Sequence, residues 1–392
     1  MQAIKQLYRI GHGPSSSHTI APYRIAVAYR QQYPECERYR IVLGASLAMT
    51  AKGHGTLSII EEALECHDIE YVFQPEHKDN IMNICGFHVD KKEKTWHAVS
   101  LGGGAVRIRE YDIGDDDNVY EEENFEEIKA YLKKEDKSLL EYIYTFEPDL
   151  KEYLKQCLEV MFATVRKGLS SEGLLNKDLN YYRIAKKLYE KAENRKDYLV
   201  AYSYAACEEN AAGGLMCTAP TLGSCGVLTS LMYYLRFNEN KDIDTLCDML
   251  AIGGVFGNCI KNNASIAGSV GGCQAEIGTA TAMAAAAISY LEGYDLPSIE
   301  YAAEMGVEHF LGLTCDPVMG YVIIPCIERN AISIMRAYDC AYLTGQFKNI
   351  KSNAISFDSV VKAMNYTGQK LATELKETSL GGLSLEYRYA KH

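Results

Sequence analysis

The spacing of apolar and polar residues divides the chain into two parts. Near the amino terminus, short apolar runs typical of β-strands alternate with helical stretches. Residues 39–42 and 69–73 are predicted strands, and residues 57–66 are a predicted helix. This mixture predicts an α+β domain, which we assign to residues 1–135.

Further along the chain, apolar residues recur three and four positions apart, as at Leu139, Tyr142 and Ile143. That spacing is the period of an amphipathic helix. The alanine-rich residues 279–290 carry no charge and predict a helix that is buried on all sides. The second domain, residues 136–392, is therefore predicted to be mostly α-helical.

Charge is unevenly distributed along the chain. Acidic residues gather between residues 115 and 127, where we expect a solvated helix start or a linker. Residues 210–235 carry no charge and residues 251–291 carry two charged side chains, yet polar residues and glycines interrupt every apolar run. No uninterrupted membrane-length span exists. The pattern predicts buried loops and close helix contacts around an internal site.

The composition narrows the class of protein further. Of the 392 residues, 47% are hydrophobic and 23% are charged, which is typical of a globular chain. A net charge of −12 argues against nucleic-acid binding, because that function needs a basic surface. The amino terminus lacks a signal-peptide pattern. We therefore expect a cytosolic protein that acts on a small molecule and has neither a nucleic-acid nor a membrane partner.

Two polar turns are candidates for chemistry. Residues 13–19, Gly-Pro-Ser-Ser-Ser-His-Thr, precede a helical pattern, and hydroxyls and amides at a helix N-terminus can bind a carboxylate or phosphate. In residues 50–56, Lys52 and His54 stand among glycines, and a loop histidine can act as a general base. An ordinary helix cap and an inert loop histidine are the alternative interpretations.

The glycines at residues 102–104 also allow two interpretations. Their amides could cradle an anion, or they could form a tight connection between two strands. The anion cradle would suit a pyridoxal-phosphate enzyme, with Lys52 or Lys261 as the lysine that forms the Schiff base. No characteristic lysine motif accompanies these glycines.

The thirteen cysteines of a cytosolic chain are expected to stay reduced. No Cys-x-x-Cys pair occurs, which excludes zinc ribbons and thioredoxin-like motifs, so any metal site would use dispersed ligands. Three cysteines beside glycine or proline stand out, and three in charge-poor stretches are rivals. The first three are Cys273, Cys315 and Cys326, and the rivals are Cys217, Cys225 and Cys259. Spacing alone does not choose among them.

These segments resemble one family, the oxygen-sensitive, iron–sulfur L-serine dehydratases. The resembling motifs follow the family's order from one end of the chain to the other, with both catalytic portions in one polypeptide. They are residues 13–19, Lys52-Gly53-His54, Thr218-Ala219-Pro220-Thr221, Asn263-Ala264-Ser265-Ile266, Gly272-Cys273-Gln274, residues 315–330 and residues 377–383.

The resemblance implies a fold and a set of site residues. It implies an N-terminal α+β domain related to amino-acid-binding regulatory domains, and a helical domain that carries a [4Fe-4S] cluster. Separations of 42 and 11 residues fit the family's cluster ligands, which would be Cys273, Cys315 and Cys326. His54 would be the catalytic base, with His18 nearby. The substrate would be bound by Ser15, Ser16, Ser17, Lys52 and Asn263.

The resemblance also implies the reaction. An iron without a protein ligand would act as a Lewis acid on the hydroxyl of L-serine, and the elimination would yield pyruvate and ammonia. A cytoplasmic homodimer that serves amino-acid catabolism and gluconeogenesis is expected. Two features depart from the family. Ala51 stands where glycine is expected, and residues 386–392 lack the cysteine that caps the open iron in several single-chain members.

Other activities stay open at this point. Threonine dehydration or cysteine desulfuration could use the same site. Threonine differs from serine in a side-chain methyl group, and cysteine differs in the leaving atom. A pyridoxal-phosphate lyase and a non-catalytic amino-acid sensor are further alternatives. The sequence alone does not select among them.

Overall fold

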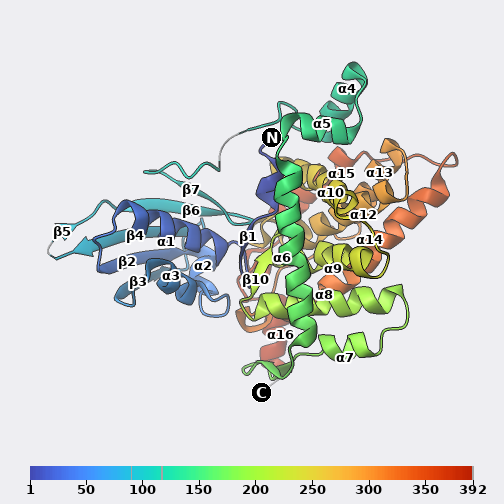
Figure 1. The fold of residues 1–392 in the computed structure, drawn as a ribbon. Helices are drawn as coiled ribbons and strands as arrows, with labels where there is room; N and C mark the ends of the chain where they lie inside the picture. Colours follow the sequence, from blue (N-terminus) through green and yellow to red (C-terminus); the bar gives the residue numbers. More distant parts are fainter. Residues whose placement is uncertain (90, 116–117, 391–392) are drawn as a thin grey trace.

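The computed structural model describes residues 1–89, 91–115 and 118–390. An α+β part that contains a sheet lies beside a larger, mostly helical part, as the sequence predicts (Figure 1). The sheet part projects to one side, and the long helix α6 (Leu150–Ser170) runs along the helical part.

The sheet is built from strands within the first 108 residues of the chain. Its order is β3-β2-β4-β6-β7, with the short strand β5 paired to β4. β2 is parallel to β3, and the other pairs are antiparallel. The predicted strands 39–42 and 69–73 are confirmed. The strands are β2 (Arg38–Gly44), β3 (Ile69–Gln74), β4 (Ile81–His88), β5 (Lys91–Lys92), β6 (Trp96–Gly102) and β7 (Ala105–Ile108).

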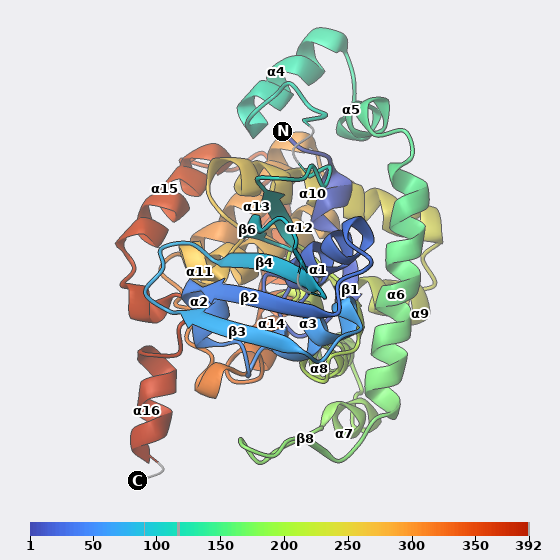
Figure 2. The same ribbon diagram turned by 90° about the vertical axis from the view of Figure 1, so that its left-hand side faces the viewer.

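Three helices accompany this sheet, whose strands face the viewer in Figure 2. Ile25, Ile41 and Ile60 are fully buried between the helices and the strands. The helix predicted at residues 57–66 is confirmed, although it ends two residues earlier because Glu65 adopts a left-handed φ of 50°. The helices are α1 (Ile20–Gln32), α2 (Ala45–Met49) and α3 (Thr56–Leu64).

The run of glycines forms the connection between β6 and β7. Gly102, Gly103 and Gly104 have positive φ values of 94°, 59° and 81°, a conformation that favours glycine. The carbonyl oxygens of Gly103 and Gly104 accept hydrogen bonds from Arg9 and Arg24. Of the two interpretations, the structure therefore shows the tight strand connection, with carbonyl oxygens directed at cations.

The helical part is organised around two buried helices, α10 (Ile243–Asn263) and α12 (Thr279–Leu291), which pack against each other. α12 is buried from Thr279 to Ser289, which confirms the buried helix predicted at residues 279–290. The remaining helices here are α4 (Phe125–Glu135), α5 (Leu139–Phe146), α7 (Ala185–Glu190), α8 (Arg195–Ala211), α9 (Cys225–Phe237), α11 (Gly268–Gly271), α13 (Leu296–Glu308), α14 (Cys326–Phe347), α15 (Phe357–Lys370) and α16 (Gly382–Ala390).

Short elements complete the helical part. The π-helix η2 (Gln274–Gly278) leads directly into α12, and the strand β1 (Ile10–His12) pairs with β10 (Leu215–Cys217). This pairing attaches the amino-terminal segment to the helical part. The other short elements are the 3-10 helices η1 (Ile4–Leu7), η3 (Val318–Gly320) and η4 (Thr373–Leu375) and the strands β8 (Leu174–Asn176) and β9 (Tyr181–Tyr182).

Helix α10 is long and apolar enough to cross a membrane by composition, and it is the one such helix among the described residues. However, 78% of its most apolar stretch is buried inside the protein. A side chain on Gly253 would collide with the carbonyl oxygen of Met283, at 2.7 Å, so α10 and α12 touch through their backbones. The charge-poor region around α10 therefore forms close helix contacts, as predicted.

The acidic stretch between the two parts is more structured than a solvated linker. Residues 116 and 117 lie outside the described residues, and Asp115 is buried. The predicted helix start is present, because Asn124 caps the amino end of α4. Phe125 is buried in the same core as Ile4, whereas Ile108 is buried in the core of the sheet. The segment before residue 135 thus packs on the helical part, and the domain boundary there stays a prediction.

Asp115 joins the two parts through two arginines, of which Arg9 is buried and Arg24 is partly buried. Its carboxylate accepts hydrogen bonds from Arg9 at 3.0 Å and from Arg24 at 2.7 and 2.9 Å. Arg9 belongs to the amino-terminal segment, where its backbone N–H donates to Thr218 of the helical part, and Arg24 lies in α1 on the sheet. Burial alone would raise the pKa of Asp115, but the two arginines hold it below its usual range.

We expect Asp115→Asn to lower the free energy of unfolding by about 3–5 kcal/mol near neutral pH, because two guanidinium groups lose their buried counter-ion. Urea unfolding measures this. The exposed Asp112 provides the control, since Asp112→Asn should change stability by less than about 0.5 kcal/mol. A depressed pKa contributes stability above the unfolded-state value and loses it as the pH falls, so the deficit should shrink toward about pH 3. Equal losses in both variants would contradict this role.

Candidate active site

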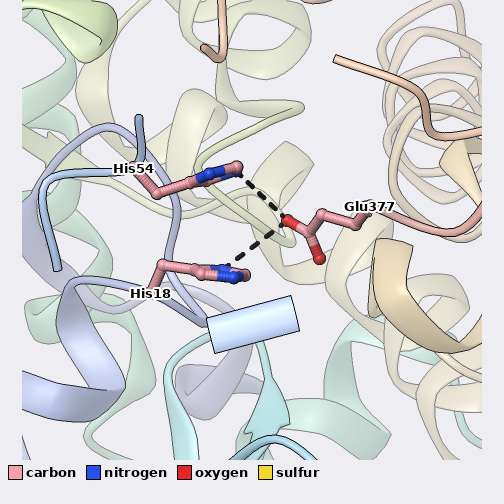
Figure 3. A group of neighbouring side chains, drawn as sticks. All are labelled: His18, His54 and Glu377. Carbon is pink, nitrogen blue, oxygen red and sulfur yellow. Dashed lines mark ion pairs between the residues drawn. The ribbon is translucent and has the colours of Figure 1, made fainter. Parts of the chain in front are cut away.

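The candidate site lies where the sheet part meets the helical part. The turn at residues 13–19 leads into α1, and the loop at residues 50–55 leads into α3, so the two polar turns stand at the amino ends of neighbouring helices. Residues 375–382 of the helical part reach the same place, where Glu377 lies near His18 and His54 (Figure 3). All three side chains are buried. The structure therefore brings together groups that are far apart in the sequence.

His18 uses both of its ring nitrogens in hydrogen bonds. Nδ1 lies 2.9 Å from the hydroxyl of Ser17 and 3.1 Å from that of Ser15, and Nε2 lies 3.2 Å from the hydroxyl of Ser46. Ser46 donates its own proton to Asn80, so its oxygen accepts from Nε2–H of His18, while Nδ1 accepts from a serine. Burial, with a smaller effect from His54, lowers the pKa of His18 to about 4. His18 is therefore a neutral residue that holds the serine turn.

His54 differs from His18 in having a nitrogen without a partner. Its ring stacks on that of His18 with centroids 4.3 Å apart, and its Nε2 lies 3.6 Å from Oε1 of Glu377. Its Nδ1 is buried and has no hydrogen-bond partner among the described residues. A buried lone pair that no protein group satisfies can accept a proton from a bound molecule. Of the two histidines, His54 therefore has the geometry of a base.

Glu377 is a site residue that the sequence reasoning did not identify. Its Oε1 lies 3.6 Å from His54, 3.7 Å from His18 and 3.4 Å from the Ser15 hydroxyl, which donates to it. Although burial alone would raise the pKa of Glu377, the two histidines and Ser15 lower it. The signal in the sequence was the motif at residues 377–383, but nothing local indicates that its acidic residue faces two distant histidines.

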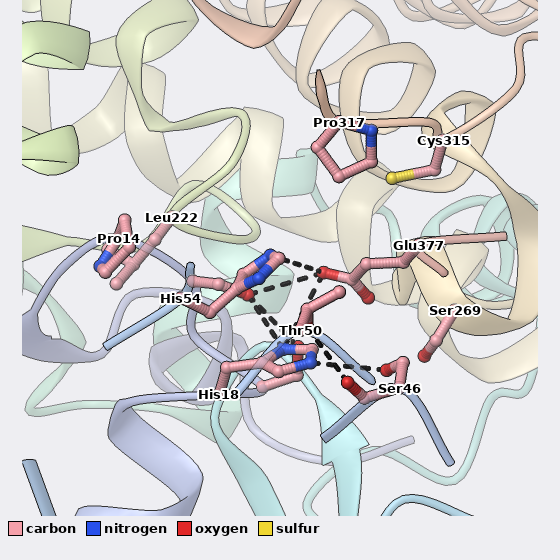
Figure 4. A network of polar contacts seen from close by, with 12 residues as sticks. Pro14, His18, Ser46, Thr50, His54, Leu222, Ser269, Cys315, Pro317 and Glu377 are labelled. Carbon is pink, nitrogen blue, oxygen red and sulfur yellow. Dashed lines mark hydrogen bonds and ion pairs between the residues drawn. The ribbon is translucent and has the colours of Figure 1, made fainter. Parts of the chain in front are cut away.

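A hydrogen-bonded network extends from the histidines into the helical part (Figure 4). Ser46, at the start of α2, bonds to Asn80, and Asn80 donates to the hydroxyl of Ser269 in α11 at 2.9 Å. Cys315 and Pro317 lie beyond Glu377 on the side away from the histidines. The network fixes the two parts relative to each other around the site.

Two of the three predicted cluster ligands lie close together. Cys273, just before the π-helix, and Cys315, in the loop before η3, have ligand atoms within 4.8 Å of each other and of Glu276. Both cysteines are buried. Cys326 is the first residue of α14. Burial raises the pKa of its thiol, and the nearby charge on Cys273 contributes to this rise. The hydrogen bond from the Cys315 thiol lowers the pKa of Cys273 to about 7, and the nearby Arg329 contributes to this shift.

The rival cysteines have different surroundings. Cys217 and Cys259 are buried in the main core of the helical part, and Cys225 packs with Ile20 and other apolar residues. Soft thiolate ligands suit iron–sulfur clusters, and an acidic thiol favours the thiolate form. The donor chemistry around Cys273 therefore fits a cluster held by three cysteines.

The remaining predicted site residues do not all lie beside His18. The Ser16 hydroxyl accepts from the backbone N–H of Leu222 at 3.5 Å, inside the junction. Lys52 is exposed and lines a cavity of about 300 Å³ on the outer side of the two loops. Asn263, at the end of α10, donates to the carbonyl oxygens of Glu123 and Cys259. Lys52 and Asn263 are thus outside the hydrogen-bonded set around His18.

Two family models match the chain. The model described as serine dehydratase alpha chain matches residues 45–384, and the model described as serine dehydratase beta chain matches residues 3–85. The first range contains Glu377 and the three candidate cysteines, and the second contains the serine turn. Together the two models cover nearly the whole polypeptide.

Relatives named L-serine dehydratase are similar over their full length. The enzyme of that name from Streptomyces coelicolor is 31% identical, over 98% of this chain and 98% of its own. L-serine dehydratase 2 of Escherichia coli is 29% identical over 98% and 99%, and the Helicobacter pylori protein is 30% identical over 97% and 98%. The chain therefore belongs to the serine dehydratase family, with the alpha-chain and beta-chain regions joined in one polypeptide.

Proposed function

We propose that the protein is an L-serine dehydratase that converts L-serine into pyruvate and ammonia with the help of a [4Fe-4S] cluster. One observation carries the proposal. A buried base with a free nitrogen, His54, stands at a junction that also holds the paired thiols of Cys273 and Cys315. The names of the relatives supply the substrate.

The serine turn supplies the binding site for the substrate carboxylate. The backbone amides at the start of α1, beside the hydroxyls of Ser15 and Ser17, are donors that suit an anion. His18 holds these hydroxyls in place through its Nδ1. Lys52, on the wall of the outer cavity, would attract the carboxylate on its way to the turn.

Cys273, Cys315 and Cys326 would hold the cluster through their thiolates. When bound, the cluster supplies a Lewis acid that assists the departure of the serine hydroxyl, which is otherwise a poor leaving group. Arg329 stands beside these thiols, so its positive charge would offset part of the negative charge of the thiolates. Residues 386–392 contain no cysteine, so a fourth thiolate would not come from these residues.

His54 performs the proton transfer. Its Nδ1 takes the Cα proton, the electron pair of that bond forms the Cα=Cβ double bond, and the Cβ–O bond breaks with release of hydroxide. The proton that His54 has taken balances this hydroxide, so that water is lost overall and the histidine returns to its neutral form. The aminoacrylate released rearranges to an imine, which water hydrolyses to pyruvate and ammonia. The Cα proton is weakly acidic, so burial and fixed dipoles must lower the barrier. The buried network around His18 supplies such fixed dipoles.

Anaerobic purification followed by three measurements tests the proposal. Iron and acid-labile sulfide should be present in cluster stoichiometry, pyruvate should form from L-serine, and exposure to air should remove both the absorption band and the activity. Parallel assays with threonine and cysteine define the substrate. A protein without iron, or an air-stable aldimine band, would overturn the proposal in favour of the pyridoxal-phosphate alternative, and serine binding without turnover would indicate a sensor. The homodimer and the cytosolic location stay predictions.

A further inference from the structure

The carboxylate of Glu377 has no assigned role, although it is buried at the centre of the site. Its Oε1 faces both histidines and Ser15, and its Oε2 has no hydrogen-bond partner among the described residues. We infer that Glu377 is a positioning residue that sets the tautomer of His54, so that Nε2 carries the proton and Nδ1 is free to act as the base. This inference rests on the proposed function.

The tautomer follows from the surroundings of the two ring nitrogens. If Nδ1 of His54 carried the proton, a buried N–H donor would have no acceptor among the described residues, at a cost of about 1–3 kcal/mol. The lone pair of Nε2 would then face the negatively charged Oε1 of Glu377, 3.6 Å away. With the proton on Nε2, the N–H faces the carboxylate instead. Both contacts therefore favour Nε2–H.

His18 does not compete for this role of Glu377. Its Nδ1 lies 3.7 Å from Oε1, but that nitrogen already accepts a hydrogen bond from Ser17, and its proton is on Nε2 toward Ser46. Among the two histidines, His54 is thus the one whose proton Glu377 can accept. At 3.6 Å the pair is at ion-pair distance, and catalytic hydrogen bonds in enzymes are often this long before substrate binds.

The backbone holds Glu377 firmly in this position. Its N–H donates to the carbonyl oxygen of Cys315 at 2.6 Å, and the N–H of Cys315 donates to Leu375 at 2.8 Å. Glu377 and Ser379 both have a φ of 59°, and the Ser379 hydroxyl donates to the Pro317 carbonyl at 2.7 Å. The same short ladder therefore fixes the carboxylate and the loop of a candidate cluster ligand. A change of position at Cys315 would be transmitted to His54.

The test compares Glu377→Gln with the matched control Glu374→Gln, an exposed residue of the same segment. Glutamine keeps the size of the side chain, but its amide can donate to Nε2 and so favour the other tautomer. We expect kcat to fall about 10²–10⁴-fold with KM changed less than about 3-fold, as when the orienting carboxylate of a catalytic triad is lost. Glu377→Asp keeps the charge, so its kcat should be at least about tenfold higher than that of Glu377→Gln protein.

Nitrogen NMR of the anaerobic holoprotein with ¹⁵N-labelled histidine gives a second readout. The His54 signals, assigned by their absence from His54→Gln protein, should show an unprotonated Nδ1 in the wild type and the Glu374→Gln control. In Glu377→Gln protein we expect Nδ1 to be protonated. Iron content and melting temperature are measured alongside, because a purely structural role would change those and leave the tautomer as it was.

The outcomes separate this inference from the proposed function. If wild type and control form pyruvate and Glu377→Gln protein does so at a similar rate with unprotonated Nδ1, the positioning role is wrong while the dehydratase stands. If neither wild type nor control forms pyruvate, the proposed function fails, and the NMR comparison still decides the tautomer. Equal losses in the aspartate and glutamine variants, with a lowered melting temperature and an unchanged tautomer, would also overturn the inference.

Discussion

Cys315→Ala protein should contain much less iron and sulfide than the wild type and should form pyruvate from L-serine at least about 10³-fold more slowly. The expected loss corresponds to several kcal/mol of transition-state stabilisation by a Lewis acid. Cys315 is the cysteine most tightly built into the site, because its thiol lies near Cys273 and Glu276 and its backbone holds Glu377. Removing this thiol leaves two of the three proposed ligands.

The measurement is iron and sulfide analysis with a pyruvate assay, all under anaerobic conditions. Cys340→Ala is the matched control, since Cys340 is equally buried but lies within α14, where its neighbours are Arg336, Asp339 and two glutamates of α13. The control shows what a cavity at a buried cysteine does to stability alone, and it should keep its iron and its activity. Full iron content and turnover in Cys315→Ala protein would refute the assignment of the cluster ligands.

The second large effect is expected from His54→Gln. Glutamine fills the space of the imidazole but cannot take a proton, so kcat should fall about 10²–10⁴-fold, which is the usual contribution of a general base. The iron content should stay at the wild-type level, because His54 lies at the junction with Glu377 rather than among the cysteines. Loss of turnover with an intact cluster would separate proton transfer from cofactor binding.

Steady-state kinetics of the anaerobic protein measure this effect, with the absorption band of the cluster as the check on loading. His67→Gln serves as the control, because the His67 side chain is 91% exposed and pairs with Glu61 at the surface. It should behave as the wild type does. A His54→Gln protein with wild-type kcat would mean that another group removes the Cα proton.

The local pattern of the sequence predicted the elements well. The strands around residues 39–42 and 69–73, the helix near residues 57–66 and the buried helix at 279–290 are all present, because their period depends on neighbouring residues in the chain. The acidic stretch was predicted less well. Asp115 is buried because Arg9 and Arg24, from distant segments, surround it, and a run of acidic residues carries no information about such partners.

The candidate site was predicted in part. The polar turns and the cysteines were found from residue type and from the resemblance to a family, and the structure brings the serine turn, His18 and His54 together. It leaves Lys52 on an outer cavity and Asn263 at the end of α10. Their roles in substrate binding stay predictions.

The sequence by itself determined the division into an α+β and a helical part, the reactive residue types and the family, because these depend on local period, composition and motif order. Only the tertiary structure gave the physical difference between His54 and His18, since that difference depends on which ring nitrogens find hydrogen-bond partners. It also revealed Glu377, whose segment is held beside the histidines by backbone hydrogen bonds with Cys315. Contacts between distant segments decide hydrogen bonding and charge in a buried site, and no local pattern encodes them.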